Sequence, residues 1–280
     1  MKFVFVADFF AEDVAGGGEL NNEEAISLLR EEFEVIKKKS ALIDLSFLKR
    51  NKDSFFIVSG FLGMRPDVKQ ALINDHKYII YEHDHKYLKS RNPAPYENFL
   101  APKTEIVNFD LYKKSKAVLV QTSFHKQIMK KNLEIDNIIS LGGNLWSVND
   151  LENMRNLANK KKRQACSIMK SDIHHKNTAD ALKYCLAKKL PYTLVASKNY
   201  QEFIEALSDN DTLVFFPKTP ETLSRVVVEA RMMGMKVITN NLVGATREEW
   251  FELKGSSLVD VMTRKRETIV EAIKKVFLNE

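Results

Sequence analysis

The chain has 280 residues and a net charge of +6, and its 44% hydrophobic and 29% charged content is typical of a soluble globular protein with room for two domains. No run approaches the roughly 20 apolar residues that span a bilayer, and the apolar run within Met1–Ala7 is too short for a signal peptide. The basic excess favours an anionic partner, such as a nucleotide, an acidic lipid surface or nucleic acid.

The chain begins with a predicted strand and a glycine-rich loop. Lys2–Ala7 is predicted to form a strand, and a loop with the triplet Gly16–Gly18 follows it. We predict a helix that is capped by Asn21 or Asn22 and runs to about Lys38. A strand, a glycine-rich loop and a helix in this order can place backbone amides against a phosphate or a sugar. A glycine triplet alone is more often a flexible turn.

The next predicted strands lead to a cluster of titratable residues. We predict strands at Ala41–Asp44, Phe55–Ser59 and Tyr78–Tyr81, and a helix over residues 66–74 that begins at a proline. The last strand runs directly into Glu82-His83-Asp84-His85. Because open α/β sheets bind ligands at the carboxyl ends of their strands, we predict a ligand site here.

The histidines of this cluster allow two further interpretations. His83 and His85 can bind a metal if they share a face, but the sequence offers no third ligand at a matching spacing. Alternatively, they are structural histidines. The following segment, Tyr87–Pro102, contains Arg91 and three prolines, and it predicts a loop or short helix over the site.

The rest of the chain repeats the β/α unit. Further strands are predicted at Lys116–Gln121, Asn137–Leu141, Ala165–Met169, Tyr192–Ala196, Leu213–Phe216 and Lys236–Thr239. Helices are predicted at Ser123–Asn132, Trp146–Arg163, Thr178–Lys188, Tyr200–Leu207 and about Arg264–Phe277. With about ten strands, the pattern predicts two parallel sheets. We assign residues 1–145 to an N-terminal domain, 146–163 to a connection, 164–262 to a C-terminal domain, and 263–280 to a helix that can pack back on the N-terminal domain.

The segment Asp211–Ala245 carries two glutamates at a predicted helix. Pro220 sets the start of this helix at or just before Glu221, and Gly234 supplies a left-handed C-cap. Glu229 then lies inside the helix, about 12 Å from Glu221 along the axis.

Two carboxylates at this separation cannot share one proton or one metal, but they can hold two ends of an elongated ligand. Between them, free helix amides at residues 222–224 and the cation Arg225 predict a site for a phosphate or diphosphate. For an isolated pair, the simpler interpretation is that Glu221 interacts with the helix dipole and Glu229 is solvated.

The segment resembles the donor-site signature of the retaining GT-B glycosyltransferases of family four. That signature has a strand ending in proline, two glutamates separated by seven residues, an alanine after the second, and a glycine before a Val-Ile strand. In this sequence these are Pro217, Glu221, Glu229, Ala230, Gly234, Val237 and Ile238. The sequence departs from the family where Thr222-Leu223-Ser224 replaces a Gly-Phe-Gly type run.

The resemblance implies an α/β GT-B fold, with two Rossmann-like domains whose parallel sheets face each other across a cleft. It implies catalytic roles for Glu221, His83 and Asp84. The donor-binding residues it implies are Lys170, Lys176, Thr222, Leu223, Ser224, Arg225 and Glu229, the last of these contacting the ribose. The residues it places on the acceptor side are Gly16, Gly17, Gly18 and Arg91. Lys170 stands where the family has arginine, and a lysine cannot make the same bidentate contact.

The implied activity is transfer of a sugar from a UDP- or GDP-sugar to a hydroxyl acceptor, with retention of configuration and without a metal or other cofactor. The acceptor stays open between a lipid, a glycan and a hydroxymethylated DNA base, and the basic charge favours peripheral contact with an anionic surface. Two alternatives keep the fold: a sugar-nucleotide epimerase or phosphorylase, and a nucleotide-sugar-binding protein without catalysis. Cys166 and Cys185 show no metal-type spacing, so we expect a cytoplasmic protein.

Overall fold

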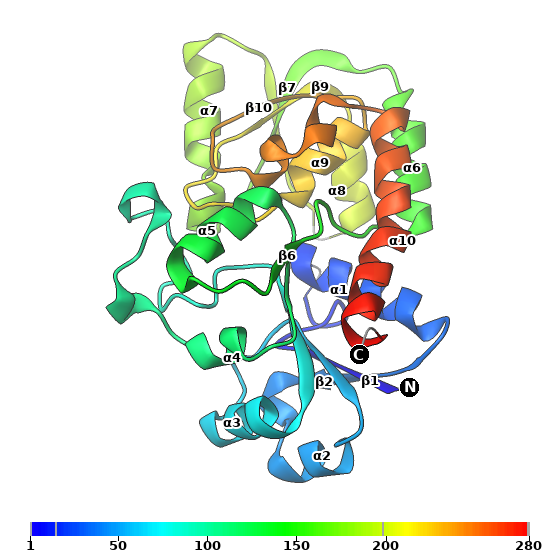
Figure 1. The fold of residues 1–280 in the computed structure, drawn as a ribbon. Helices are drawn as coiled ribbons and strands as arrows, with labels where there is room; N and C mark the ends of the chain where they lie inside the picture. Colours follow the sequence, from blue (N-terminus) through cyan, green and yellow to red (C-terminus); the bar gives the residue numbers. More distant parts are fainter. Residues whose placement is uncertain (1, 15, 198, 279–280) are drawn as a thin grey trace. The chain divides into compact units, whose positions relative to one another are not determined.

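The computed structural model describes residues 2–14, 16–197 and 199–278, and the chain divides into two compact units (Figure 1). The first unit contains the described residues up to Leu145 and those from Arg266 onward. The second unit is Trp146–Lys265. Each unit contains one parallel sheet, so both have an α/β architecture.

The first unit has a six-stranded sheet in the order β2-β1-β3-β4-β5-β6. Its strands are β1 (Lys2–Ala7), β2 (Glu34–Lys39), β3 (Phe55–Val58), β4 (Lys77–Glu82), β5 (Val118–Val120) and β6 (Ile138–Ser140). The helices between them are α1 (Gly17–Arg30), α2 (Leu45–Arg50), α3 (Pro66–Asp75), α4 (Phe109–Lys113) and α5 (Ser123–Leu133).

The central strand β1 shows why both faces of this sheet are covered. Its residues Phe3 to Val6 are fully buried, which is the continuous apolar run expected of a parallel strand. Phe3 and Phe5 pack into one core cluster together with α1, whereas Val4 and Val6 pack into another together with α2 and α3.

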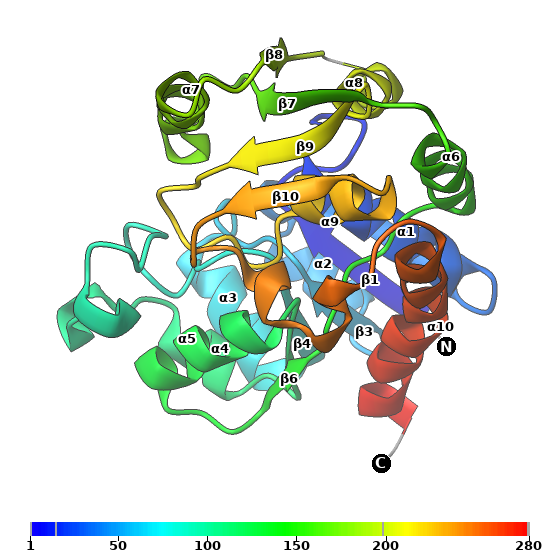
Figure 2. The same cartoon turned by 90° about the horizontal axis from the view of Figure 1, so that it is seen from above.

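The second unit has a four-stranded sheet in the order β10-β9-β7-β8, whose strands Figure 2 shows side by side. Its strands are β7 (Arg163–Met169), β8 (Tyr192–Val195), β9 (Asn210–Phe215) and β10 (Lys236–Thr239). Its helices are α6 (Val148–Ala158), α7 (Thr178–Ala187), α8 (Tyr200–Leu207) and α9 (Arg225–Met232). The last helix, α10 (Ser256–Leu278), starts in this unit, and its residues from Arg266 onward belong to the first unit.

The second strand of the first unit lies earlier in the chain than predicted. The prediction of a strand at Ala41–Asp44 and of a helix to Lys38 was wrong, because β2 pairs with β1 over its whole length. The β-branched pair Val35-Ile36 favours a strand, and the lysines that follow suit an edge strand, where charge blocks further pairing. Asp44 instead caps α2, accepting a hydrogen bond from Phe47 N at 2.6 Å.

Candidate functional site

In the second sheet the strand order reverses between β7 and β9, because the chain continues from β7 to β8 on one side and then crosses to β9 on the other. Open α/β sheets bind ligands outside the carboxyl ends of the strands at such a point. Lys176 follows β7 and Glu221 follows β9, and the structure brings the two side chains together. Lys176 Nζ lies 2.8 Å from Glu221 Oε1 and 3.0 Å from Oε2.

Backbone contacts hold both members of this pair in place. The left-handed residue Asn177, next to Lys176, donates from Nδ2 to Phe216 O at 2.8 Å, which ties the loop after β7 to the end of β9. Glu221 N donates to Leu242 O at 2.8 Å, which ties its loop to the segment after β10. The side chains of Lys176 and Glu221 remain 27% and 12% exposed, so the ion pair is sheltered but accessible to a ligand.

Helix α9 begins at Arg225, so the prediction of a helix start at Glu221 was wrong. Residues 221–223 instead pair with the segment after β10, where Ala245 N donates to Leu223 O at 3.0 Å. The amides of Thr222 and Leu223 therefore do not belong to the first turn of the helix, and Glu221 and Glu229 do not lie on one helix.

Ser224 is the N-cap residue of α9 and has a left-handed backbone, with φ 76° and ψ 88°. It occupies a position where the family-four pattern has glycine, the residue that adopts this conformation without strain. Its buried Oγ has no hydrogen-bond partner in the part of the chain that the structure describes.

Glu229 is buried rather than solvated, which corrects the simpler interpretation from the sequence. Trp146 Nε1 donates to its Oε1 at 2.9 Å and Tyr200 OH donates to the same oxygen at 2.7 Å. Arg225 Nε lies 3.2 Å from this oxygen, and the guanidinium stacks over the Trp146 ring at 4.5 Å. Burial, together with the nearby Glu229 carboxylate, raises the pKa of Tyr200 well above its usual value, so the phenol stays a donor.

Lys170 lies directly after β7 with an exposed side chain. Its backbone amide continues the pairing with β8 by donating to Val195 O at 2.8 Å. The Lys170 side chain is therefore available to a ligand at the carboxyl ends of the strands, where Lys176 also lies.

In the first sheet the strand order reverses between β1 and β3, and Asp8 lies at that point. Its Oδ1 accepts hydrogen bonds from Ser40 Oγ at 2.5 Å and from Gly63 N at 3.2 Å, which joins the loops after β1, β2 and β3. Gly60 is required here, because a Cβ atom at this position would lie 2.4 Å from Asp8 N.

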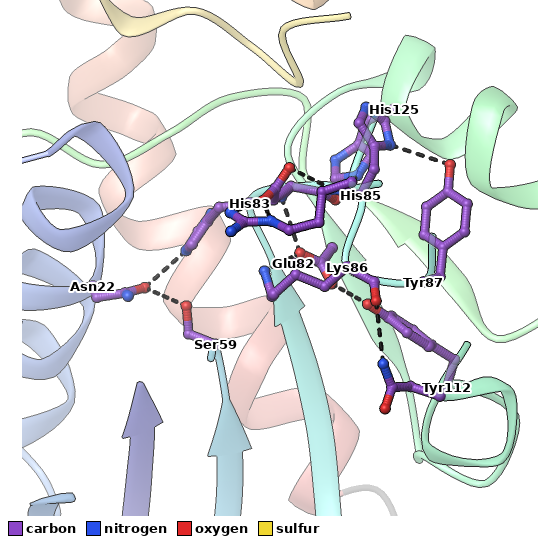
Figure 3. Close-up of polar contacts among 12 residues, drawn as sticks. Asn22, Ser59, Glu82, His83, His85, Lys86, Tyr87, Tyr112 and His125 are labelled. Carbon is purple, nitrogen blue, oxygen red and sulfur yellow. Dashed lines mark hydrogen bonds and ion pairs between the residues drawn. The ribbon is translucent and has the colours of Figure 1, made fainter. Parts of the chain in front are cut away.

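His83 lies just beyond β4 and points toward α1 (Figure 3). Its Nε2 is 2.8 Å from Asn22 Oδ1, and Ser59 Oγ donates to the same oxygen at 3.0 Å. The same ring nitrogen lies 3.4 Å from Asn21 Nδ2, so the two asparagines place an acceptor and a donor beside His83 Nε2.

The first turn of α1 packs against His83. A Cβ atom on Gly18 would lie 3.6 Å from the His83 Cβ, while Gly17 begins the helix and Gly16 is its N-cap. The prediction that Asn21 or Asn22 caps this helix was wrong, since both side chains are buried within it. Asn21 Nδ2 donates to the Tyr81 hydroxyl at 2.7 Å, and Asn22 contacts His83 and Ser59.

Asp84, predicted to be catalytic, and Arg91, predicted to lie on the acceptor side, form an ion pair. Arg91 Nε donates to Asp84 Oδ2 at 2.6 Å, and a second guanidinium nitrogen contacts the same oxygen. Burial opposes ionisation of Asp84, but the charges of Lys86 and Arg91 outweigh it and hold the pKa of Asp84 below its usual value. Asp84 is therefore an ionised, paired carboxylate.

A fully buried carboxylate, Glu82, anchors the turn that carries His83 and Asp84 (Figure 3). It accepts hydrogen bonds from Lys86 Nζ and Tyr112 OH, and from Asp84 N at 2.9 Å. Burial raises the pKa of the Glu82 carboxyl and that of the Tyr112 phenol.

The two histidines proposed as metal ligands point to different partners. His83 points toward Asn22, whereas His85 Nδ1 lies 3.1 Å from the Tyr87 hydroxyl (Figure 3). The His85 ring also meets the edge of His125, with 5.1 Å between centroids. Across the described ranges no group of three or more His, Cys, Asp and Glu residues has a geometry suited to a metal ion. None of the described helices combines the length and apolarity needed to cross a membrane.

Several residues around these sites were not found from the sequence. They are Tyr112, His125, Trp146 and Tyr200, together with Asn21 and Asn22, which the sequence suggested only as helix caps. One pattern in the sequence could have identified Asn21 and Asn22. If the helix is taken to begin at the glycine triplet, both asparagines fall on its buried side together with its apolar residues.

No protein-family model matches the chain, and no curated protein matches it. Among solved structures it is similar to HepE of Anabaena in complex with UDP and glucose, with a TM-score of 0.55 and 13% identity over 99% of this chain and 92% of that one. It is also similar to an α-glucosyltransferase in complex with UDP and a 13-mer DNA containing an HMU base (TM-score 0.51, 11% identity, 97% and 94% coverage). A glycosyltransferase from Rickettsia africae has a TM-score of 0.50 at 13% identity, covering 99% of this chain and 93% of that one. These likenesses confirm the predicted α/β GT-B fold, built here from two Rossmann-like units with parallel sheets.

Proposed function

We propose that the protein is a glycosyltransferase that binds a nucleotide-diphosphate sugar at the carboxyl edge of the second sheet and transfers the sugar to a hydroxyl acceptor. The observation that carries this proposal is the Lys176–Glu221 pair, which lies where the strand order of that sheet reverses. The fold supports it, because the structurally similar HepE binds UDP and glucose, and the similar α-glucosyltransferase binds UDP.

In this proposal the positive charges of the second unit stabilise the leaving diphosphate. Lys176 exchanges its Glu221 partner for phosphate oxygens, and Lys170 and Arg225 add charge at the same edge. Ser224 Oγ, buried without a partner, supplies a further donor. Preorganised donors directed at charge that develops in the transition state are the main catalytic contribution in such reactions. These cations supply the role that a metal would otherwise take, so we propose a metal-independent reaction with a UDP- or GDP-sugar.

Glu221, released by Lys176, accepts hydrogen bonds from hydroxyls of the donor sugar. Glu229 accepts a hydrogen bond from the ribose. No carboxylate stands out as a covalent nucleophile, so we propose retention of configuration by front-face displacement. On the first unit, His83, beside the glycine triplet, is proposed to contact the reacting sugar, and the Asp84–Arg91 pair to form part of the acceptor wall.

Replacing Glu221 tests this assignment. Glu221→Ala is expected to lower sugar transfer or donor hydrolysis at least about 100-fold, the loss that follows removal of one catalytic hydrogen-bonding group. Release of labelled sugar from UDP-glucose and from GDP-sugars measures both activities. Glu205→Gln, an exposed glutamate on α8, is the matched control and should be fully active. Full activity in Glu221→Ala would contradict the assignment of Glu221 to the catalytic site.

The same assay separates the alternatives. An epimerase converts the donor without an acceptor, a phosphorylase needs phosphate, and a binding protein turns over none of the donors while still binding nucleotide. Acceptor classes are then compared by adding lipid vesicles, glycans, or DNA with hydroxymethylated bases. Binding to DNA that weakens steeply with salt would support the nucleic-acid acceptor.

A further inference from the structure

Two neighbouring asparagines of α1 are buried inside the first unit, and both reach His83. Asn21 is 0% exposed and Asn22 is 3% exposed. His83 Nε2 lies 2.8 Å from Asn22 Oδ1 (Figure 3) and 3.4 Å from Asn21 Nδ2. Burying an amide side chain is unfavourable unless its polar atoms are hydrogen-bonded, and asparagine is a weak helix former. The reason for asparagine at these two positions therefore lies in the contacts that their side chains make.

A backbone donor fixes the orientation of the first amide. Leu145 N donates to Asn21 Oδ1 at 2.9 Å, and because a backbone N–H only donates, the amide oxygen faces Leu145. The amide nitrogen Nδ2 faces the other partners, which are the Tyr81 hydroxyl at 2.7 Å and His83. Asn21 therefore presents a donor to the His83 ring.

The second amide presents an acceptor to the same ring. Asn22 Oδ1 accepts a hydrogen bond from Ser59 Oγ at 3.0 Å and lies beside His83 Nε2 (Figure 3). Ser59 is buried and directly follows β3, so this contact also ties α1 to the end of that strand. The Tyr81 ring of β4 meets the imidazole edge-on, with 4.5 Å between centroids. The His83 ring is therefore held by both α1 and β4.

A donor and an acceptor beside one ring nitrogen suit an imidazole in either tautomer. Nε2 of a neutral imidazole is either an N–H donor or a lone-pair acceptor. When Nε2 carries the proton it donates to Asn22 Oδ1, and when it does not it accepts from Asn21 Nδ2. The ring therefore keeps its place when the proton moves between its two nitrogens. The shorter distance to Asn22 favours the tautomer with the proton on Nε2.

We propose that Asn21 and Asn22 are positioning residues, which hold the His83 imidazole in one orientation in either of its tautomers. The inference rests on the proposed function, in which His83 contacts the reacting sugar. Neither asparagine touches the ligand in this arrangement, and both act through His83.

The tautomer of His83 tests the proposal without any substrate. Long-range proton–nitrogen correlation spectra of the isotope-labelled full chain distinguish the two tautomers, and the His83 signals are those missing from His83→Gln. We expect wild-type His83 to carry its proton mainly on Nε2. Asn22→Leu, which removes the acceptor, should raise the ratio of the Nδ1–H to the Nε2–H tautomer at least about threefold, as the loss of one hydrogen bond predicts. Asn21→Leu, which removes the donor, should not raise it. Asn74→Leu, at an exposed position on α3, is the matched control and should keep the wild-type ratio.

Sugar release tests the catalytic consequence. In the labelled-sugar assay, Asn22→Leu should lower kcat at least about tenfold with little change in the KM for the donor, because a misplaced side chain slows the reaction whereas the nucleotide binds to the second unit. In a His83→Gln background the same substitution should have no further effect, since the effects of residues that act through one another are not additive. Asn74→Leu should keep the wild-type kinetics.

Other outcomes overturn the inference. A wild-type ring protonated mainly on Nδ1 would do so, as would a tautomer ratio that Asn22→Leu leaves unchanged or that both leucine variants raise alike. A loss of kcat that persists in full in the His83→Gln background would show a purely structural role. The expected tautomer shifts without sugar release by the wild-type protein would overturn the proposed function and leave the positioning of His83 supported. Should circular dichroism show that a leucine variant is unfolded, the alanine variant at the same position is judged by the same ratio and kinetics.

Discussion

At the scale of single residues, a histidine that contacts the turn after β4 makes the stability of the first unit depend on pH. His125, on α5, is fully buried and its Nε2 lies 3.0 Å from Asp84 O. Since a carbonyl oxygen only accepts, Nε2 carries the proton of a neutral imidazole. Burial lowers the pKa of His125 well below its usual value, and His85 adds to the effect.

The lowered pKa predicts a loss of stability in mild acid. The unfolded chain takes up a proton on His125 below about pH 6.5, whereas the folded chain does not, so the free energy of unfolding falls by up to about 1.4 kcal/mol per pH unit below that value. Urea unfolding of the wild type and His125→Gln between pH 7.5 and 5.5 measures this slope, which should be smaller in the variant. His174→Gln, an exposed histidine, should keep the wild-type slope. Equal slopes for the wild type and His125→Gln would contradict the prediction.

The sequence identified candidate residues better than it identified their partners. Lys176 and Glu221 follow from motif spacing, but nothing local shows that residues 45 apart form an ion pair. Glu229 was found in the same way, and its partner Trp146 lies 83 residues away in the chain. Such contacts depend on strand order, which is a property of the folded sheet. The roles of the site residues remain predictions.

At the scale of elements, α9 has a left-handed residue at each end. Ser224 precedes it with φ 76°, and Gly234 follows it with φ 77°, which confirms the predicted glycine C-cap. Glycine adopts this backbone freely, whereas a residue with a Cβ atom costs about 1–2 kcal/mol there. The two positions therefore predict opposite responses to substitution.

Ser224→Gly should raise the free energy of unfolding by about 1 kcal/mol, and Gly234→Ala should lower it by about the same amount. Urea denaturation measures both. Ser224→Ala separates backbone from hydroxyl effects, because it removes Oγ and keeps the Cβ atom. Gly234→Asn should cost less than Gly234→Ala, since asparagine tolerates this conformation better. A Ser224→Gly variant no more stable than the wild type would show that the backbone strain is absent.

The predicted boundaries of helices and strands were wrong where backbone pairing with a distant segment outweighed the local sequence preference. Pro220 is a sound helix-start signal, yet α9 begins at Arg225 because residues 221–223 pair with the segment after β10. Residues 34–39 continue a helix-forming sequence of glutamates and lysines, yet they form β2 because β1 offers an unpaired edge beside them. Strands with strong apolar runs, such as β4 and β9, were located to within a few residues.

At the scale of the whole molecule, each unit has its own core, and α10 contributes to both. Leu258, Val259 and Met262 belong to a buried cluster of the second unit. Further along the helix, Ile273 and Phe277 belong to a cluster of the first unit. Ion pairs Arg266–Glu24 and Lys274–Glu32 add contacts between α10 and the first unit. The fold class followed from the β/α repeat, and the sequence also predicted a helix over residues 263–280 that can pack back on the N-terminal domain. It did not predict that this helix begins at Ser256, within the second unit.

Separate cores predict that a defect in one unit leaves the other stable. Phe277 is 2% exposed, and its ring lies 5.4 Å from that of Phe3 and 4.7 Å from that of Phe55. Phe277→Ala should therefore destabilise the first unit by about 3–5 kcal/mol, the cost of removing a buried phenylalanine. The neighbouring Leu278→Ala, at a 51% exposed position, should change stability by less than about 0.5 kcal/mol.

Two probes distinguish the units during guanidinium unfolding. Both tryptophans, Trp146 and Trp250, lie in the second unit, so their fluorescence reports that unit alone, whereas far-UV circular dichroism reports the whole chain. In Phe277→Ala the dichroism should show an earlier transition while the fluorescence midpoint stays at its wild-type value, because the tryptophans and Phe277 belong to different core clusters. If both midpoints shifted together, the two cores would unfold as one cooperative structure, and α10 would be the covalent element best placed to couple them.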